Sequence, residues 1–138
     1  MPTSVTFRKP RALIVEDEIL IAEELRERLS SLGFSVIAAV DSAEQGIAIA
    51  TRERPDVVLM DIRLKGVKDG VEAAEEIYEQ ADVALVYLTA HSDQLTVERA
   101  KRTHYDGFIL KPFRTQELRS TIEIAMYRHA LRIKQREQ

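Results

Sequence analysis

The chain has 138 residues, enough for one domain, and its 45% of apolar residues can supply an ordinary hydrophobic core. It contains no cysteine, which excludes disulfide bonds and thiolate metal sites, and its formal net charge of −3 gives no reason to expect nucleic acid as a partner. No apolar stretch approaches the roughly 18 residues of a membrane helix, and the N-terminus lacks the apolar core of a signal peptide. We therefore expect a cytoplasmic protein without membrane attachment.

The first half of the chain alternates between strand and helix patterns. Residues 1–10 carry two prolines and no periodicity, which predicts a flexible N-terminal arm. A strand is predicted near Ala12–Val15, followed by a helix with apolar residues at helical spacing that Gly33 ends. Ser35–Val40 predicts a second strand, after which Ser42-Ala-Glu-Gln45 matches a capping box and opens a second helix.

The second half continues this alternation. Its elements are a strand at Val57–Met60, a glycine-punctuated loop over 62–70, a helix from Val71, a strand at Ala84–Leu88, a weaker helix over 92–104 and a strand at Phe108–Leu110. Five strands that alternate with helices predict an α/β fold, namely a doubly wound five-stranded parallel sheet with flanking helices.

The last predicted helix is unusually long. Thr115 can cap it, and nothing interrupts it from Gln116 to Gln135, about 30 Å at the helical rise. One apolar stripe can cover the sheet, and a second is left over: Ile124, Tyr127, Leu131 and Ile133. We expect residues 11–127 to form the domain and residues 128–138 to extend its last helix. The spare stripe indicates a homodimer or a partner contact, although the basic helix end also suits the macrodipole.

Polar groups that can handle phosphate follow four of the five predicted strands. Glu16 and Asp17 follow the first, Asp61 the third, Thr89 the fourth and Lys111 the fifth. Ligand sites of open α/β sheets lie at the carboxyl ends of the strands, so we expect these groups to converge. Two carboxylates about 5 Å apart repel by roughly 3 kcal/mol, so the cluster needs more positive charge than Lys111 supplies. Mg²⁺ suits such an all-oxygen site, although any one of these acids alone could be a solvated loop residue or a helix cap.

The order of these groups resembles the receiver domain of two-component response regulators. The matching pieces are Leu-Ile-Val-Glu16-Asp17-Glu, Val-Leu-Met-Asp61-Ile-Arg-Leu, Tyr-Leu-Thr89-Ala90-His and Gly107-Phe108-Ile-Leu-Lys111-Pro112-Phe, and the resemblance covers roughly residues 11–127. It implies a flavodoxin-like (CheY-like) receiver with Asp61 as phosphoacceptor. It also implies that Mg²⁺ is held by Glu16, Asp17, Asp61 and the main-chain carbonyl of Arg63. Thr89 and Lys111 would contact the phosphoryl oxygens, and Thr89 and Phe108 would switch on activation.

Some positions near the expected site bear on how closely this chain follows the pattern of the family that it resembles. Arg63 and His91 lie where family side chains tune the attack of water on the acyl phosphate, and the bulk of Arg63 predicts slow hydrolysis. Lys65 stands where proline is frequent, and the loop carries an extra residue before Asp69-Gly70. These changes leave the metal ligands intact but alter a loop to which a kinase would dock.

The resemblance implies a single-domain response regulator that receives a phosphoryl group on Asp61 from a histidine kinase or phosphotransfer protein. It would be a phosphoacceptor switch and not an enzyme, and it would signal by conformational change, dimerisation or partner binding. The alternative is a phosphohydrolase with an aspartyl-phosphate intermediate, many of which carry a second aspartate where Arg63 stands. A flavodoxin-like cofactor carrier would need a phosphate-binding loop where Glu16-Asp17-Glu18 would repel phosphate. Both glycine-rich nucleotide fingerprints are missing.

Overall fold

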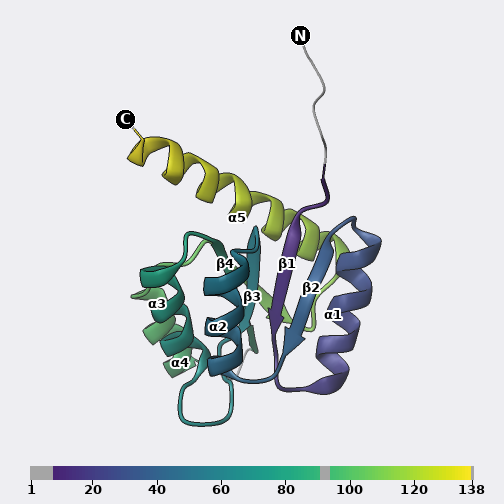
Figure 1. Cartoon of the computed structure of the whole chain (residues 1–138). Helices are drawn as coiled ribbons and strands as arrows, with labels where there is room; N and C mark the ends of the chain where they lie inside the picture. The colour runs from purple at the N-terminus through teal and green to yellow at the C-terminus, as the bar shows by residue number, and fades with distance from the viewer. Residues whose placement is uncertain (1–7, 91–93, 138) are drawn as a thin grey trace.

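In the computed structural model of the chain, residues 8–90 and 94–137 are described, and they form a parallel sheet between two layers of helices (Figure 1). The strands are β1 (Arg11–Val15), β2 (Ser35–Val40), β3 (Val57–Asp61), β4 (Ala84–Ala90) and β5 (Gly107–Lys111). The helices are α1 (Ile19–Ser31), α2 (Ala43–Glu53), α3 (Gly70–Gln80), α4 (Gln94–Lys101) and α5 (Thr115–Arg136). The predicted five-stranded, doubly wound α/β fold is confirmed.

The order of the strands places a crevice at the middle of the sheet. Strand order is β2-β1-β3-β4-β5, so the chain winds to one side of β1 and then returns to build the other side from β3 onward. In the register of β1 against β3, Val15 pairs with Met60, so Glu16, which follows β1, and Asp61, which ends β3, lie side by side at the carboxyl edge of the sheet. Ligands of open α/β sheets bind where the winding reverses in this way.

Two apolar layers hold the sheet in place. Leu13 and Val15 of β1 belong to the apolar layer on the side of the sheet that α2, α3 and α4 cover, whereas Ala12 and Ile14 belong to the layer on the side of α1 and α5. Strands β1, β3 and β4 are thus buried on both faces, which explains why they read as continuous apolar runs and not as alternating patterns. Because the strands are packed on both faces, the residues at their ends are held in fixed positions.

The helix starts agree only in part with the sequence patterns. The Ser42 hydroxyl accepts the Gln45 amide at 3.2 Å, as predicted for α2. The complete capping box is at α3, where Asp69 and Glu72 each accept the main-chain N–H of the other at 3.0 Å. The predicted cap of the last helix is wrong, because Thr115 is its first residue.

Other boundaries shift by a few residues. The weaker helix predicted over 92–104 is α4, which ends at Lys101, and positions 92 and 93 lie outside the described residues, as does His91. Residues 1–7 of the predicted arm are also outside them. Pro10, at the end of the arm, accepts the Ser35 amide at 2.8 Å and so joins the start of the sheet.

Helix α5 runs behind the sheet at the amino-terminal ends of the strands and continues past its edge (Figure 1). Its later turns are nevertheless tied to the domain by ion pairs. Arg132 pairs with Asp106 at 2.6 Å and Arg136 with Asp82 at 2.7 Å, and the His129 ring is hydrogen-bonded to Asp82 at 2.9 Å. Among residues 8–90 and 94–137, none of the helices is both long and apolar enough to cross a bilayer.

Candidate functional site

The carboxyl ends of the strands bring together most of the polar groups that the sequence placed there. Asp61 ends β3, Lys111 ends β5, and Glu16 and Asp17 follow β1. One carboxylate oxygen from each of Glu16, Asp17 and Asp61 lies within 4.8 Å of the others. Glu16 and Asp61 are only 2% and 4% exposed, so their charges cannot be dissipated by bulk water.

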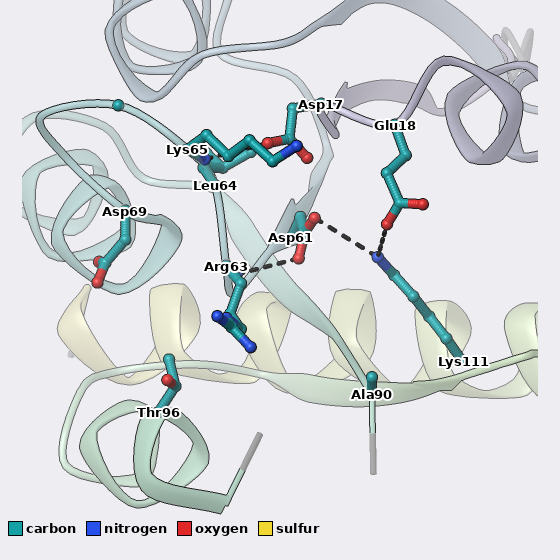
Figure 2. A pocket seen from close by; sticks show the side chains of 11 residues that line it. Asp17, Glu18, Asp61, Arg63, Leu64, Lys65, Asp69, Ala90, Thr96 and Lys111 are labelled. Carbon is teal, nitrogen blue, oxygen red and sulfur yellow. Dashed lines mark hydrogen bonds and ion pairs between the residues drawn. The ribbon is translucent and has the colours of Figure 1, made fainter. Parts of the chain in front are cut away.

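Lys111 lies among these carboxylates. Its ammonium nitrogen is 2.8 Å from Glu16 Oε1, 3.5 Å from Asp61 Oδ2 and 3.9 Å from Glu18 Oε1, and Figure 2 shows it reaching between Asp61 and Glu18. Burial alone would lower the pKa of Lys111, but the ion pairs with Glu16 and Asp61 raise it above the usual 10.5. The lysine therefore stays charged and supplies a fixed positive charge to the site.

One ammonium does not neutralise the cluster. Burial, and then the neighbouring Asp61, raise the pKa of Glu16 from 4.5 to about 7, although Lys111 opposes the shift. Negative charge is therefore in excess. An all-oxygen donor set with excess negative charge fits a hard divalent cation such as Mg²⁺.

Main-chain amides of the segment after β3 hold two of the carboxylates. The Arg63 N–H donates to Asp61 Oδ1 at 3.0 Å, and the Lys65 N–H donates to Asp17 Oδ2 at 3.0 Å. The loop between β3 and α3 is thereby folded over the acidic cluster. A proline at position 65 could not make the second bond, because proline has no N–H.

A cleft of about 580 Å³ opens beside Asp61. Figure 2 shows acidic and basic side chains around it, and those that line it are Asp17, Glu18, Asp61, Asp69, Arg63, Lys65 and Lys111. Gly70 closes the back of this region, because a β carbon there would lie 1.9 Å from the carbonyl oxygen of Asp61. The start of α3 can pack this closely on the end of β3 only if residue 70 is glycine.

Thr89, unlike Asp17, Asp61 and Lys111, does not line this cleft. It is buried at the end of β4, and its hydroxyl donates to the Ala90 carbonyl at 3.3 Å. It lines a separate groove of about 480 Å³ beside α4 and β5. Contact with a group on Asp61 would require the hydroxyl to leave the Ala90 carbonyl.

Phe108 belongs to an aromatic cluster that sequence reasoning did not find. Its ring centre lies 5.4 Å from that of Tyr87 and 4.6 Å from that of Tyr105, and the Tyr87 hydroxyl lies 2.7 Å from the Thr103 hydroxyl. Burial raises the pKa of Tyr87 to about 12, so the phenol stays protonated. The fully apolar context of Tyr87 in β4 was the one signal that its hydroxyl needs a buried partner.

A second contact that the sequence did not reveal joins α4 to the site. Arg99 pairs with Asp69 at 2.8 Å, and Asp69 both caps α3 and lines the cleft. The pairing residues are 30 positions apart, so no local pattern could have indicated it.

Comparisons with known proteins agree on one family. The sequence matches the model of the response regulator receiver domain over residues 12–123. It is 35% identical over 118 residues to the transcriptional regulatory protein PdtaR of Mycobacterium tuberculosis, a match that covers 86% of this chain and 57% of PdtaR. The chain therefore spans little more than half the length of this relative.

Solved structures resemble the fold closely. The signal receiver domain of a modulated diguanylate cyclase from Desulfovibrio desulfuricans G20 superposes with a TM-score of 0.85 at 37% identity, over 90% of this chain and 98% of that one. The receiver domain of the sensor histidine kinase PA1611 from Pseudomonas aeruginosa PAO1 has a TM-score of 0.78 at 31% identity, over 86% and 98%. The latter structure holds a magnesium ion coordinated in its active site cleft.

Proposed function

The chain belongs to the receiver domain family of two-component response regulators, and on this premise we propose that it accepts a phosphoryl group on Asp61 and acts as a phosphorylation switch. The observation that carries the proposal is the placement of Asp61. Its carboxylate is buried at the end of a fully apolar strand, opens onto the cleft and lies 3.5 Å from the Lys111 ammonium.

The chemical step needs little acid–base catalysis. An Asp61 oxygen attacks the phosphorus atom of the donor and forms an acyl phosphate, while the bond to the leaving group breaks and its electron pair departs with that group. Positioning and charge neutralisation dominate such transfers. Lys111 contributes its fixed positive charge to the phosphoryl oxygens. Thr89 contributes a hydrogen bond once its hydroxyl turns away from the Ala90 carbonyl.

The carboxylates of Glu16, Asp17 and Asp61, with the carbonyl of Arg63, would hold Mg²⁺. The support comes from the excess negative charge that raises the pKa of Glu16 and from the spacing of the three carboxylates. The bound ion would supply further positive charge opposite the phosphoryl oxygens.

Thr89 and Phe108 supply the switch in this proposal. Thr89 follows Tyr87 by two residues along β4, and Phe108 packs against the Tyr87 ring. A turn of the Thr89 hydroxyl toward the phosphoryl group would change the groove beside α4 and β5 that Thr89 lines. The surface presented to partners would thereby depend on phosphorylation.

The donor in this proposal is a histidine kinase or a phosphotransfer protein, and the product is read by a partner or by a second copy of the chain. A phosphohydrolase is less well supported, because Arg63 stands at the position of the second aspartate. A guanidinium is not deprotonated in proteins, so Arg63 cannot replace that aspartate as a general acid or base. The bulk of Arg63 beside the cleft supports a long-lived acyl phosphate.

Phosphorylation with a small donor tests the assignment. The protein is incubated with acetyl phosphate and Mg²⁺, and its intact mass is measured. We expect one added phosphoryl group in the parent, none in Asp61→Asn, and one in Asp69→Asn, whose side chain lines the same cleft. Labelling of Asp61→Asn at the level of the parent would refute Asp61 as the acceptor.

A further inference from the structure

Helix α4 buries fewer side chains than any other helix of the domain. Of its eight residues only Ala100 is buried, whereas α3 buries five of eleven. A helix with so little buried surface belongs to the less stable part of a fold and can shift at small cost in free energy. The polar contacts of α4 therefore matter more for its position than such contacts do elsewhere.

Helix α4 separates the cleft beside Asp61 from the groove beside β5. Thr96 of α4 lines the cleft (Figure 2), and Arg99 lies three residues later on the same side of the helix. The opposite side of the helix lines the groove with Gln94, Glu98 and Lys101. A shift of α4 toward the groove would therefore move Arg99 away from the cleft.

An ion pair joins the cleft side of α4 to the start of α3. Arg99 Nη1 lies 2.8 Å from Asp69 Oδ2. The other carboxylate oxygen of Asp69 accepts the Glu72 amide at 3.0 Å and caps α3, so the acceptor is itself held in place. Burial alone would raise the pKa of Asp69, but the Arg99 guanidinium and the Glu72 amide hold it below the usual 3.8, and the carboxylate stays charged. The pair thus favours this position of α4 over any position in which Arg99 is displaced.

Thr89 connects the position of α4 with Asp61. The Thr89 hydroxyl donates to the Ala90 carbonyl at 3.3 Å, and the residue lines the groove on the far side of α4 from the cleft. In the proposed function this hydroxyl turns toward a phosphoryl group on Asp61, which vacates space in the groove. Helix α4 can then move into that space, and Arg99 would leave Asp69.

We propose that the Arg99–Asp69 ion pair restrains α4 in the arrangement of the unphosphorylated protein and thereby slows the phosphorylation of Asp61. Arg99 is a positioning residue in this proposal, because it acts through α4 and does not contact the phosphoryl group. Its role rests on the proposed function, although the effect of the pair on α4 is measurable without phosphorylation. A contact that exists in only one of two states shifts the equilibrium by its own free energy. Both side chains are partly exposed, so loss of the pair should change the rate by about two- to fivefold.

Two neutral substitutions test the restraint in the full chain. Asparagine caps helices as well as aspartate does, so Asp69→Asn removes the charge and keeps the cap of α3. Arg99→Gln removes the other partner. Acetyl phosphate and Mg²⁺ supply the phosphoryl group, and the intact mass at timed intervals gives the rate. We expect each variant to be phosphorylated about two- to fivefold faster than the parent. The double variant should be no faster than either, because the same contact is lost in all three.

The direction of the two effects separates restraint from attraction of the anionic donor. Arg99→Gln removes a positive charge near the cleft and Asp69→Asn a negative one, so attraction would change the two rates in opposite directions. Loss of the pair changes them in the same direction. Arg102→Gln removes an exposed charge just after α4 and should match the parent. Arg99→Lys should also match it, because the contact uses a single guanidinium nitrogen that an ammonium can replace.

Amide hydrogen exchange reports on α4 without phosphorylation. In the metal-free, unphosphorylated protein we expect residues 94–101 to exchange faster in Arg99→Gln and Asp69→Asn than in the parent. Residues 19–31 of α1 should exchange equally in all three proteins, which shows that the effect is local. A parent that takes up no phosphoryl group would refute the proposed function, whereas a labelled parent with unchanged variants would refute only the role of the ion pair.

Three results would overturn the proposal. Unchanged exchange in α4 would show that the ion pair does not hold the helix. Rate changes of opposite sign in Arg99→Gln and Asp69→Asn would assign the effect to charge near the cleft. Additive effects in the double variant would show that the two residues act separately.

Discussion

At the scale of single residues, the Glu16 carboxyl is buried beside a second carboxylate, and both effects disfavour its charged form. Burial and the nearby Asp61 raise its pKa from 4.5 to about 7, against the effect of Lys111. Between these pH values the folded protein retains a proton that the unfolded chain has released. The free energy of unfolding therefore falls as the pH rises through this interval and levels off above pH 7.

We expect the metal-free parent to lose at most about 3 kcal/mol of stability between pH 4.5 and pH 7, and Glu16→Gln to lose this dependence. Urea unfolding at a series of pH values measures it. Glu18→Gln is the control, because Glu18 is mostly exposed and should leave the curve of the parent unchanged. A Glu16→Gln variant that keeps the full decrease would assign the titration to another group.

In the proposed function, Lys65 supports the Mg²⁺ site through its main-chain N–H. Its N–H donates to Asp17 Oδ2 at 3.0 Å. Asp17 is a proposed Mg²⁺ ligand, and loss of a hydrogen bond to a ligating carboxylate commonly changes metal affinity 10–100-fold. We expect Lys65→Pro to weaken Mg²⁺ binding about tenfold. Lys65→Ala keeps the amide and should bind like the parent. Isothermal titration calorimetry gives both affinities, and equal values for the two variants would exclude the amide.

At the scale of elements, the contact between α3 and β3 sets the back of the site. A β carbon on Gly70 would meet the Asp61 carbonyl oxygen at 1.9 Å, so a side chain there must displace the start of α3 or the end of β3. We expect Gly70→Ala to destabilise the fold by about 3 kcal/mol or more and to slow the phosphorylation of Asp61.

Gly46→Ala is the comparison for that substitution. Its added β carbon would meet the side chain of Val15 at 2.8 Å and no main-chain atom among its three nearest neighbours. A side chain can adjust more easily than a strand, so this variant should lose less stability and keep its rate of phosphorylation. Thermal unfolding and the intact-mass assay compare the two. A Gly70→Ala variant that matches the parent in both would show that α3 moves freely.

The elements that could be predicted from the sequence are those that burial dictates. Buried parallel strands must be apolar throughout, so β1, β3 and β4 stand out as runs, and their polar neighbours then mark one edge of the sheet. The start of α5 was predicted wrongly because Thr115 is a common cap. The actual cap position is Arg114, whose N–H is satisfied at 3.1 Å by the Glu117 carboxylate three residues later.

Contacts that join distant elements could not be predicted in this way. Tyr87 packs against Phe108 because β4 and β5 pair in a register that places the two residues opposite each other, and its hydroxyl meets that of Thr103 in the segment between α4 and β5. The orientation of Thr89 is likewise a matter of side-chain rotation, which a sequence pattern does not specify. The convergence of Glu16, Asp17, Asp61 and Lys111 at one edge of the sheet could thus be predicted, but the side-chain rotation of Thr89 and the contacts with distant elements could not.

At the scale of the whole molecule, the ion pairs beneath α5 join its later turns to the domain. Asp106 is 3% exposed, accepts the Leu85 amide at 2.9 Å and pairs with Arg132 at 2.6 Å. Loss of Arg132 leaves a buried carboxylate poorly paired. We expect Arg132→Ala to destabilise the fold by about 2–4 kcal/mol. Arg119→Ala, an exposed control on the same helix, should stay within about 0.5 kcal/mol of the parent.

Urea unfolding gives both differences, and a double-mutant cycle with Asp106→Ala isolates the pair itself. A coupling energy near zero between positions 106 and 132 would show that α5 is held by its apolar face alone.

Ion pairs hold β5 at both of its ends. Asp106 immediately precedes the strand and is tied to Arg132, and Lys111 ends it and is tied to Glu16 and Asp61. The strand is about 17 Å long and connects the cleft to the C-terminal turns of α5. As an edge strand it is paired on one side only, with β4, so less resists its sliding than would resist a central strand. If a phosphoryl group on Asp61 displaced Lys111, the displacement would be transmitted along β5 to Asp106 and so to Arg132 of α5. No loop lies between these two ends of the path.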